Sequence, residues 1–173
     1  YTVPKWVRLT NLAINWRSED YTERAYQFLG EYGALYKITD PKQVLRAQSQ
    51  KQDKLGLTHV TLQQVSDGVP VFAGQLQFNF RPDGTIVSIH GNIIPGVSSI
   101  NSKPTISAKQ AQQIAKQAVP DQSDLQTTEP ILYYYNHGIF SKKKESTYLV
   151  WTFSVYSKAA LIDFGGMNGR LTS

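Results

Sequence analysis

The run Leu55–Phe80, LGLTHVTLQQVSDGVPVFAGQLQFNF, constrains the fold more than any other part of this 173-residue chain. Residues 57–65 are rich in Thr, Val and Leu, which suit a pleated, half-buried strand. Asp67-Gly68 follows, and Gly accepts the positive φ of a tight turn at little cost. The strand pattern then resumes over residues 69–80, so the run predicts an antiparallel β-hairpin.

The second strand of this hairpin alternates between two kinds of side chain. The expected buried face carries Phe72, Leu76, Phe78 and Phe80, and the opposite face carries Gln75, Gln77 and Asn79. A period of two with one apolar face predicts a sheet that is buried on one side. Pro70 cannot donate to a ladder, so we expect it at a strand end or edge. A turn at residues 82–84 and a strand over residues 85–92 would complete a meander.

Residues 20–37 predict an amphipathic helix that begins with Asp20 and Glu23 as a capping pair. Its expected buried stripe consists of Ala25, Phe28, Leu29, Tyr32, Leu35 and Tyr36. The polar residues 38–54 indicate an exposed connection or an irregular strand. One helix laid across the meander would bury both apolar faces.

The C-terminal part of the chain repeats this plan after a linker predicted at residues 95–104. Ser107 and Gln110 form a capping box, and the helix that follows has an apolar stripe of Ala111, Ile114, Ala115, Ala118 and Val119. Strands are expected over residues 130–136, 147–157 and 159–164. We therefore predict an α+β fold with two helix-on-antiparallel-sheet modules in tandem, residues 1–96 and 97–173.

The candidates for catalysis are few. The three histidines, His59, His90 and His137, have no second histidine at the spacing of a His-Glu-x-x-His zinc motif. The sequence also has no Gly-x-Ser-x-Gly elbow and no phosphate-binding loop. We predict no catalytic, cofactor-binding or metal-binding residue and no enzyme activity in this chain. His59 and His90 are expected to be hydrogen-bonded strand residues, and His137 a solvated turn residue.

Charge and hydropathy narrow the choice of partners. The net charge is +5, and the one dense run, residues 142–144, is expected to be a solvated loop. No nucleic-acid-binding signature accompanies it, and no apolar run reaches the ~20 residues that span a bilayer. The absence of cysteine leaves the compartment open. Because Tyr1 is not an initiator Met, we expect a processed chain.

Aromatic residues gather in the C-terminal module at residues 133–135 and at Trp151 and Phe153. Packing in a core is the first interpretation. A patch that binds a partner is the second, because Tyr and Trp are enriched in such patches.

The hairpin resembles a known family. Its residues 55–64 and 68–74, followed by Asp83-Gly84 and residues 89–92, are similar to the fungalysin/thermolysin propeptide domain. Thr61 stands where family members often have Arg, and Ala73 where they often have a second Gly. The C-terminal module resembles a PepSY domain in residues 104–111, residues 149–151, Ile162-Asp163 and residues 168–171, although residues 164–167 depart from its usual spacing.

These resemblances imply the propeptide of a secreted, thermolysin-like zinc metalloprotease. Such a propeptide is an intramolecular chaperone and an inhibitor. Its partner is the cognate catalytic domain, bound covalently in the precursor or non-covalently after cleavage. The alternative is a free-standing two-module binding or protease-inhibitor protein. A metalloprotease domain encoded after Ser173 would favour the first, and a stop codon there the second.

Two groups of residues are the expected contacts with the partner. On the hairpin they are Asp67, Gly68, Gln75, Gln77 and Asn79, because the apolar face is assigned to the core. At the C-terminal end they are Gly169, Arg170, Leu171, Thr172 and Ser173, because the end of a propeptide must approach the scissile bond.

Overall fold

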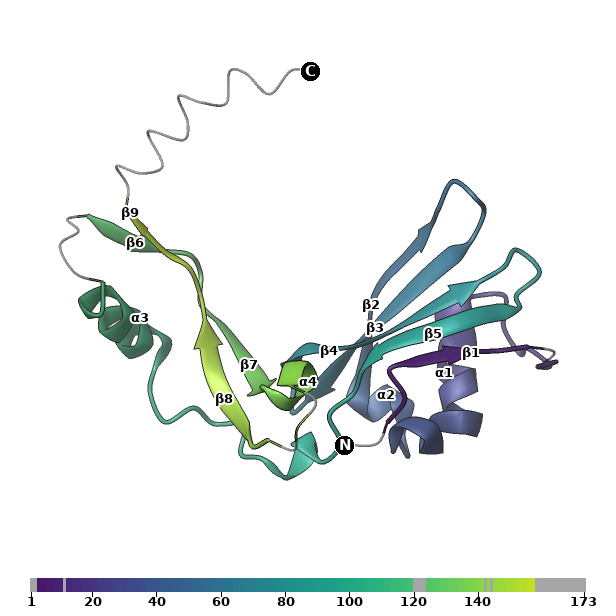
Figure 1. Ribbon diagram of the computed structural model, residues 1–173, viewed down its shortest axis with the longest axis horizontal. Coiled ribbons are helices and arrows are strands. Elements are labelled where there is room, and N and C mark those ends of the chain that lie inside the picture. Colours follow the sequence, from purple (N-terminus) through teal and green to yellow (C-terminus); the bar gives the residue numbers. More distant parts are fainter. Residues whose placement is uncertain (1–2, 11, 120–123, 142, 144, 158–173) are drawn as a thin grey trace, which may run out of the picture. The chain divides into compact units, whose positions relative to one another are not determined.

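The computed structural model describes residues 3–10, 12–119, 124–141, 143 and 145–157. The chain divides into two units (Figure 1). Unit 1 comprises residues 1–102 and 134–148, and unit 2 comprises residues 103–133 and 149–173. The division into domains 1–96 and 97–173, expected from the sequence, stays a prediction.

The fold is α+β, as predicted from the sequence. In the first 102 residues the elements are β1 Trp6–Arg8, α1 Tyr21–Tyr32, the 3₁₀ helix η1 Gly33–Tyr36, α2 Pro41–Val44, β2 Leu45–Gln52, β3 Thr58–Ser66, β4 Val69–Phe80, β5 Ile86–Asn92 and the 3₁₀ helix η2 Val97–Ser99. Then follow α3 Ala108–Gln117, β6 Leu125–Thr127, β7 Ile131–Asn136, α4 Gly138–Ser141, β8 Thr147–Thr152 and β9 Val155–Ser157.

Unit 1 is built on a sheet in which the five strands β1-β5-β4-β3-β2 pair antiparallel in this order, and β7 pairs in parallel with β4 at Val71 and Tyr134. α1 packs against one face of this sheet (Figure 1). Fully buried side chains from both layers form the core, among them Phe28 and Leu29 of α1 and Val60, Leu62, Leu76, Phe78, Phe80 and Ile89 of the strands. The predicted helix-on-sheet layer is therefore confirmed for this part of the chain.

The predicted cap of α1 is half correct. The Asp20 carboxylate accepts the backbone N–H of Glu23 at 2.9 Å, which ties down the first turn. In a full capping box the Asp20 N–H would donate to the Glu23 side chain. Here the Asp20 N–H donates to the Ser18 hydroxyl instead, at 3.1 Å. The Glu23 carboxylate instead accepts from Lys42 Nζ at 2.8 Å.

The prediction that Leu35 is buried is wrong, since its exposed fraction is 46%. α1 ends at Tyr32, and η1 continues with about three residues per turn, which rotates Leu35 away from the stripe. A Cβ at Gly33 would lie 2.6 Å from the Ile38 carbonyl oxygen, so a glycine is needed where the chain turns.

The hairpin of β3 and β4 forms as predicted. Asp67 and Gly68 both have positive φ, 47° and 79°, as the tight turn between two strands requires. Pro70 lies at the strand end, where it pairs with Val65. β5 begins one residue later than predicted, after the turn at Gly84.

The prediction that Phe72 belongs to the buried face is also wrong, since its exposed fraction is 38% whereas Val71 is fully buried. Ala73 has a φ of 55°, and the register between β3 and β4 shifts between Gln63 and Val65. This bulge reverses the alternation of faces within one strand. The Gln63 amide fixes it by donating to the carbonyl oxygens of Val71 and Gly74, both at 2.8 Å.

The two edge strands of this five-strand order are β2 and β1. The polar stretch 38–54 folds into α2 and the mostly exposed strand β2, whose register shifts between Ala47 and Ser49, in agreement with an irregular strand. β1 was not predicted, because its three residues lack a pattern of their own. It pairs with β5, opposite residues 88–90.

Unit 2 contains α3, the antiparallel pair β6 and β9, and the ends of β7 and β8. The capping box of Ser107 and Gln110 is present with both of its hydrogen bonds. The strand predicted over residues 147–157 is divided into β8 and β9, and the short strand β6 was not predicted. The strand predicted over residues 159–164 lies outside the described residues.

Candidate functional site

The face of the sheet opposite α1 carries the polar residues of β3, β4 and β5. Cross-strand pairing places His59 opposite Asn79, and Asn79 opposite Ser88. The neighbouring row places Thr61 opposite Gln77, and Gln77 opposite His90. Because directly paired residues share a face, these side chains form one polar surface, called here the outer face.

A hydrogen-bond network centred on Asn79 joins the three strands. The Asn79 Oδ1 accepts from His59 Nδ1 at 2.6 Å and from Gln77 Nε2 at 3.0 Å. The Asn79 Nδ2 donates to the Ser88 hydroxyl at 2.9 Å and lies 3.3 Å from His90 Nδ1. All four partners come from the outer face, so the amide of Asn79 holds this face in one arrangement.

The other ring nitrogen of His59 extends the network to the loop between β2 and β3. His59 Nε2 lies 3.0 Å from Asp53 Oδ2. Both ring nitrogens therefore face oxygen acceptors, and only an imidazolium can donate to both. The pKa of His59 is raised above its ordinary 6.5, first by the bond to Asn79 and second by the bond to Asp53. The pKa of Asp53 is lowered, mainly by the bond to His59.

The structure places the predicted contact residues in three different settings. Gln75 and Gln77 are half-buried on the outer face, and Asn79 is buried among its partners. Asp67 and Gly68 are exposed at the end of β3 that is remote from Asp53. The five C-terminal residues, 169–173, lie outside the described residues. Binding of a partner by any of these residues stays a prediction.

Sequence reasoning identified His59 and His90 as hydrogen-bonded strand residues, and the structure confirms it. It missed the part played by Asp53, whose carboxylate organises the loop before β3. A signal was present, because an Asp side chain in a short loop commonly accepts the backbone N–H two residues further on, as Asp53 does from Leu55. The sequence alone did not show that this loop is closed.

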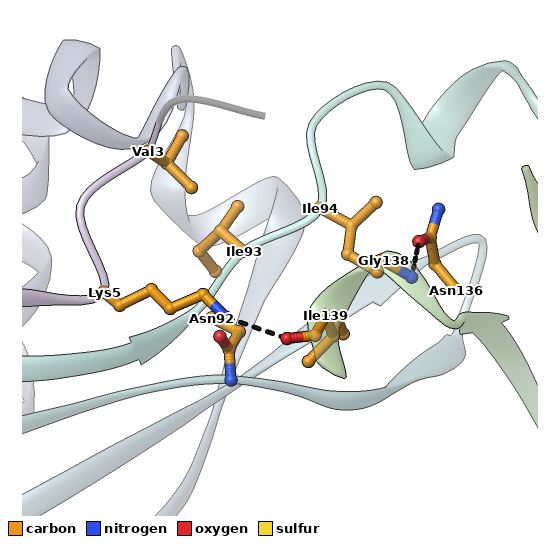
Figure 2. A pocket seen from close by; sticks show the side chains of 8 residues that line it. All are labelled: Val3, Lys5, Asn92, Ile93, Ile94, Asn136, Gly138 and Ile139. Atoms are coloured by element: carbon orange, nitrogen blue, oxygen red, sulfur yellow. Dashed lines mark hydrogen bonds between the residues drawn. The ribbon is translucent and has the colours of Figure 1, made fainter. Parts of the chain in front are cut away.

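Several hollows lie elsewhere on the described residues, and one in each unit bears on the question of function. Figure 2 shows a small one in unit 1, of about 40 Å³, in which Lys5 Nζ reaches the Ile139 carbonyl oxygen at 2.8 Å. It is lined by Val3, Lys5, Asn92, Ile93, Ile94, Asn136, Gly138 and Ile139. Lys5 is the one cationic residue that lines this hollow, and its ammonium group is already bonded to Ile139. We therefore interpret the hollow as a gap in the packing of unit 1.

Unit 2 has a larger apolar groove, of about 450 Å³, between α3 and β8. Ala111, Ile114, Ala115 and Ala118 of the predicted stripe line one side, and Trp151 and Phe153 the other. The Trp151 indole N–H donates to the Ile106 carbonyl oxygen at 3.0 Å. These aromatic rings therefore line an open surface in the described part of unit 2.

Among the described residues, no group of three or more His, Cys, Asp or Glu is placed to hold a metal ion. In the same residues, no helix has the length and apolar character that a membrane span requires.

Comparison with known families identifies the meander. Residues 44–93 match the model of the family described as the Fungalysin/Thermolysin Propeptide Motif. The match begins at the last residue of α2 and takes in β2, β3, β4 and β5. Residues 44–93 are therefore similar to a fungalysin/thermolysin propeptide motif, and the outer face is formed mainly by strands in this range.

A solved structure with a similar arrangement is the Bacillus megaterium YpeB C-terminal domain, at 16% sequence identity and a TM-score of 0.40. The similarity covers 90% of this chain and 62% of that chain, so the protein spans less than two thirds of it. A likeness at this level carries no conclusion about function.

Proposed function

We propose that the chain is the propeptide of a secreted, thermolysin-like zinc metalloprotease, for which it acts as intramolecular chaperone and inhibitor. The observation that carries the proposal is the match of residues 44–93 to a propeptide motif of this type. The chain is then a non-catalytic pro-region, and its partner is the protease domain of the same precursor.

The physical basis is template binding. A surface that binds the native-like protease lowers the free energy of that state or of the barrier that leads to it. The same surface inhibits the protease while it stays bound. The outer face supports this proposal, because its polar groups are held in one arrangement by the network around Asn79 and α1 covers the opposite face. A surface that is already ordered loses little entropy on binding.

Refolding tests the chaperone role. The protease domain of the precursor is denatured and refolded with and without this chain, and recovered activity is measured. We expect higher recovery with the chain. Equal recovery would overturn the chaperone role, and a full-length gene product without a metalloprotease domain would overturn the propeptide assignment itself.

Substitution tests the outer face. Gln77→Ala should reduce both recovery and inhibition, because Gln77 is a predicted contact residue on this face. Gln113→Ala is the matched control, since Gln113 is an exposed residue of α3. Equal effects of the two substitutions would remove the outer face from the proposal.

The tail is a separate part of the proposal. Contact of residues 169–173 with the active-site cleft of the protease domain is the second proposed interaction. Removal of residues 168–173 should weaken inhibition without loss of chaperone activity. An unchanged inhibition constant would count against a role for the tail.

A further inference from the structure

Leu55 stands out among the exposed apolar residues of the described chain. Its exposed fraction is 85%, whereas the next values among large hydrophobic residues are 62% for Tyr148 and 61% for Trp6. Leu55 lies in the loop 53–57, which joins β2 to β3. Single exposed leucines are common on protein surfaces, so exposure alone assigns no role.

The loop that carries Leu55 is fixed by its own hydrogen bonds. The Asp53 Oδ1 accepts the backbone N–H of Leu55 at 2.8 Å and that of Leu57 at 3.0 Å. The Asp53 N–H donates to the Leu57 carbonyl at 2.9 Å, and the Gly56 N–H donates to the Asp53 carbonyl at 3.1 Å. Gly56 has a φ of 83°, which a residue with a side chain rarely adopts.

The loop is also fastened to the outer face. Asp53 uses its second carboxylate oxygen for His59, and His59 is held in turn by Asn79. The tip is thus connected through two side chains to β4. Preorganisation of this kind reduces the conformational entropy that is lost when a loop binds a partner.

The exposed charged side chains next to the tip are cationic. Lys51 and Lys54 are both exposed, whereas the Asp53 carboxylate is engaged by the loop and by His59. A partner surface that complements the loop therefore needs an apolar pocket for one leucine side chain and acidic groups around that pocket.

We propose that Leu55 is an anchor residue that inserts into an apolar, acid-rimmed pocket on the partner protein. The inference rests on the proposed function, because it takes the protease domain of the precursor as that partner. Asp53 and His59 are positioning residues, which act by holding the loop in the conformation that presents Leu55.

The test is the affinity of the inactive protease domain for the isolated chain, measured by calorimetry or surface binding. Leu55→Ala should weaken binding by about tenfold or more, as truncation of an anchor residue does. The melting temperature should not change, because Leu55 is almost fully exposed. Leu35→Ala is the matched control, as it removes the same side chain from another exposed site of unit 1.

A double-mutant cycle tests the positioning residues. Asp53→Ala should weaken binding in the unsubstituted chain and have little further effect in the Leu55→Ala chain. Asp53→Asn should retain part of the affinity, since its side-chain oxygen can still accept the two N–H groups. Equal losses from Asp53→Ala in both backgrounds would show that Asp53 does not act through Leu55.

The possible results separate the two proposals. If the unsubstituted chain binds the protease domain and Leu55→Ala binds equally well, the anchor is wrong and the propeptide function stands. Equal losses for Leu55→Ala and Leu35→Ala would also overturn the anchor. If the unsubstituted chain does not bind, the proposed function fails, and the partner assigned to Leu55 fails with it.

Discussion

The helices of the two units have similar sequence patterns and different environments. α1 and α3 both begin with a side-chain cap and both carry an apolar stripe. In α1 the stripe is buried against the sheet, and Phe28 and Leu29 are almost inaccessible to solvent. In the described part of unit 2 no residue is buried, and Ile114 of α3 is exposed on its groove. An apolar stripe thus indicates a face that can be buried, and the layer opposite decides whether it is.

The two helices differ in the layer that packs against each of them. Unit 1 places α1 on an antiparallel sheet of five strands, which supplies enough apolar surface to cover the helix. The described part of unit 2 opposes α3 with residues of β8 and leaves a groove between them. We therefore expect unit 1 to dominate the stability of the chain.

The largest expected effect comes from the core of unit 1. Phe78→Ala should lower the free energy of unfolding by about 3–5 kcal/mol, because it leaves a cavity beneath α1. The control in unit 2, Ile114→Ala, should cost less than about 1 kcal/mol because Ile114 is exposed. Chemical denaturation followed by circular dichroism measures both. Similar losses for the two variants would break the contrast between the units.

A second prediction concerns the strand pairing within unit 1. Gly91 of β5 has a φ of 144°, and a Cβ there would collide with the Gln75 carbonyl oxygen. Gly91→Ala should therefore cost on the order of 2 kcal/mol. Gly30→Ala, in open space on α1, should stabilise the chain by about 0.5–1 kcal/mol. Thermal unfolding should show shifts of opposite sign, and shifts of the same sign would contradict the prediction.

A smaller effect is expected from loss of the N-terminal caps of α3 and α1. Ser107→Ala should cost about 1 kcal/mol and lower the hydrogen-exchange protection of residues 108–112, because α3 has little burial to compensate. Asp20→Ala should lose a similar cap energy while the middle of α1 stays protected by its core contacts. Equal loss of protection in both helices would show that burial does not distinguish them.

The smallest expected effect is the pH dependence of the His59 bonds. The folded state raises the pKa of His59, so this group contributes stability that is fully present below its ordinary pKa of 6.5 and is lost as pH rises through the folded value. The pKa of Asp53 is lowered, so its contribution is present above 3.8 and is lost as pH falls through its folded value. The melting temperature of His59→Gln should differ most from that of the unsubstituted chain near pH 5. A difference that grows above pH 8 would contradict this assignment.

The local elements of unit 1 were predictable because their signals are local. The tight turn at Asp67-Gly68, the period-two pattern of Leu76, Phe78 and Phe80, and the stripe of α1 each lie within a few residues. Phe72 and Leu35 were misassigned because a bulge at Ala73 and a 3₁₀ turn after Tyr32 interrupt the regular period. The bulge depends on Gln63, which belongs to the other strand, so the pattern of residues 69–80 does not reveal it.

The candidate site was predictable in part. Alternation placed Gln75, Gln77 and Asn79 on the polar face, but it did not show that Asn79 is occupied by partners from three strands. It also did not show that Asp53, twenty-six residues before Asn79, joins the same network through His59. Register between strands decides such contacts, and register depends on the bulges and turns along the whole meander.

The amino-acid sequence by itself determined the hairpin, the capped helices, the α+β class and the propeptide motif, because each is encoded by neighbouring residues or by a short run of them. The tertiary structure alone decided that Phe72 faces outward, that α3 keeps an open groove and that the loop of Leu55 is fastened to the outer face. These features depend on contacts between residues that are far apart in the chain. Strand register and the packing of layers determine which of these contacts form.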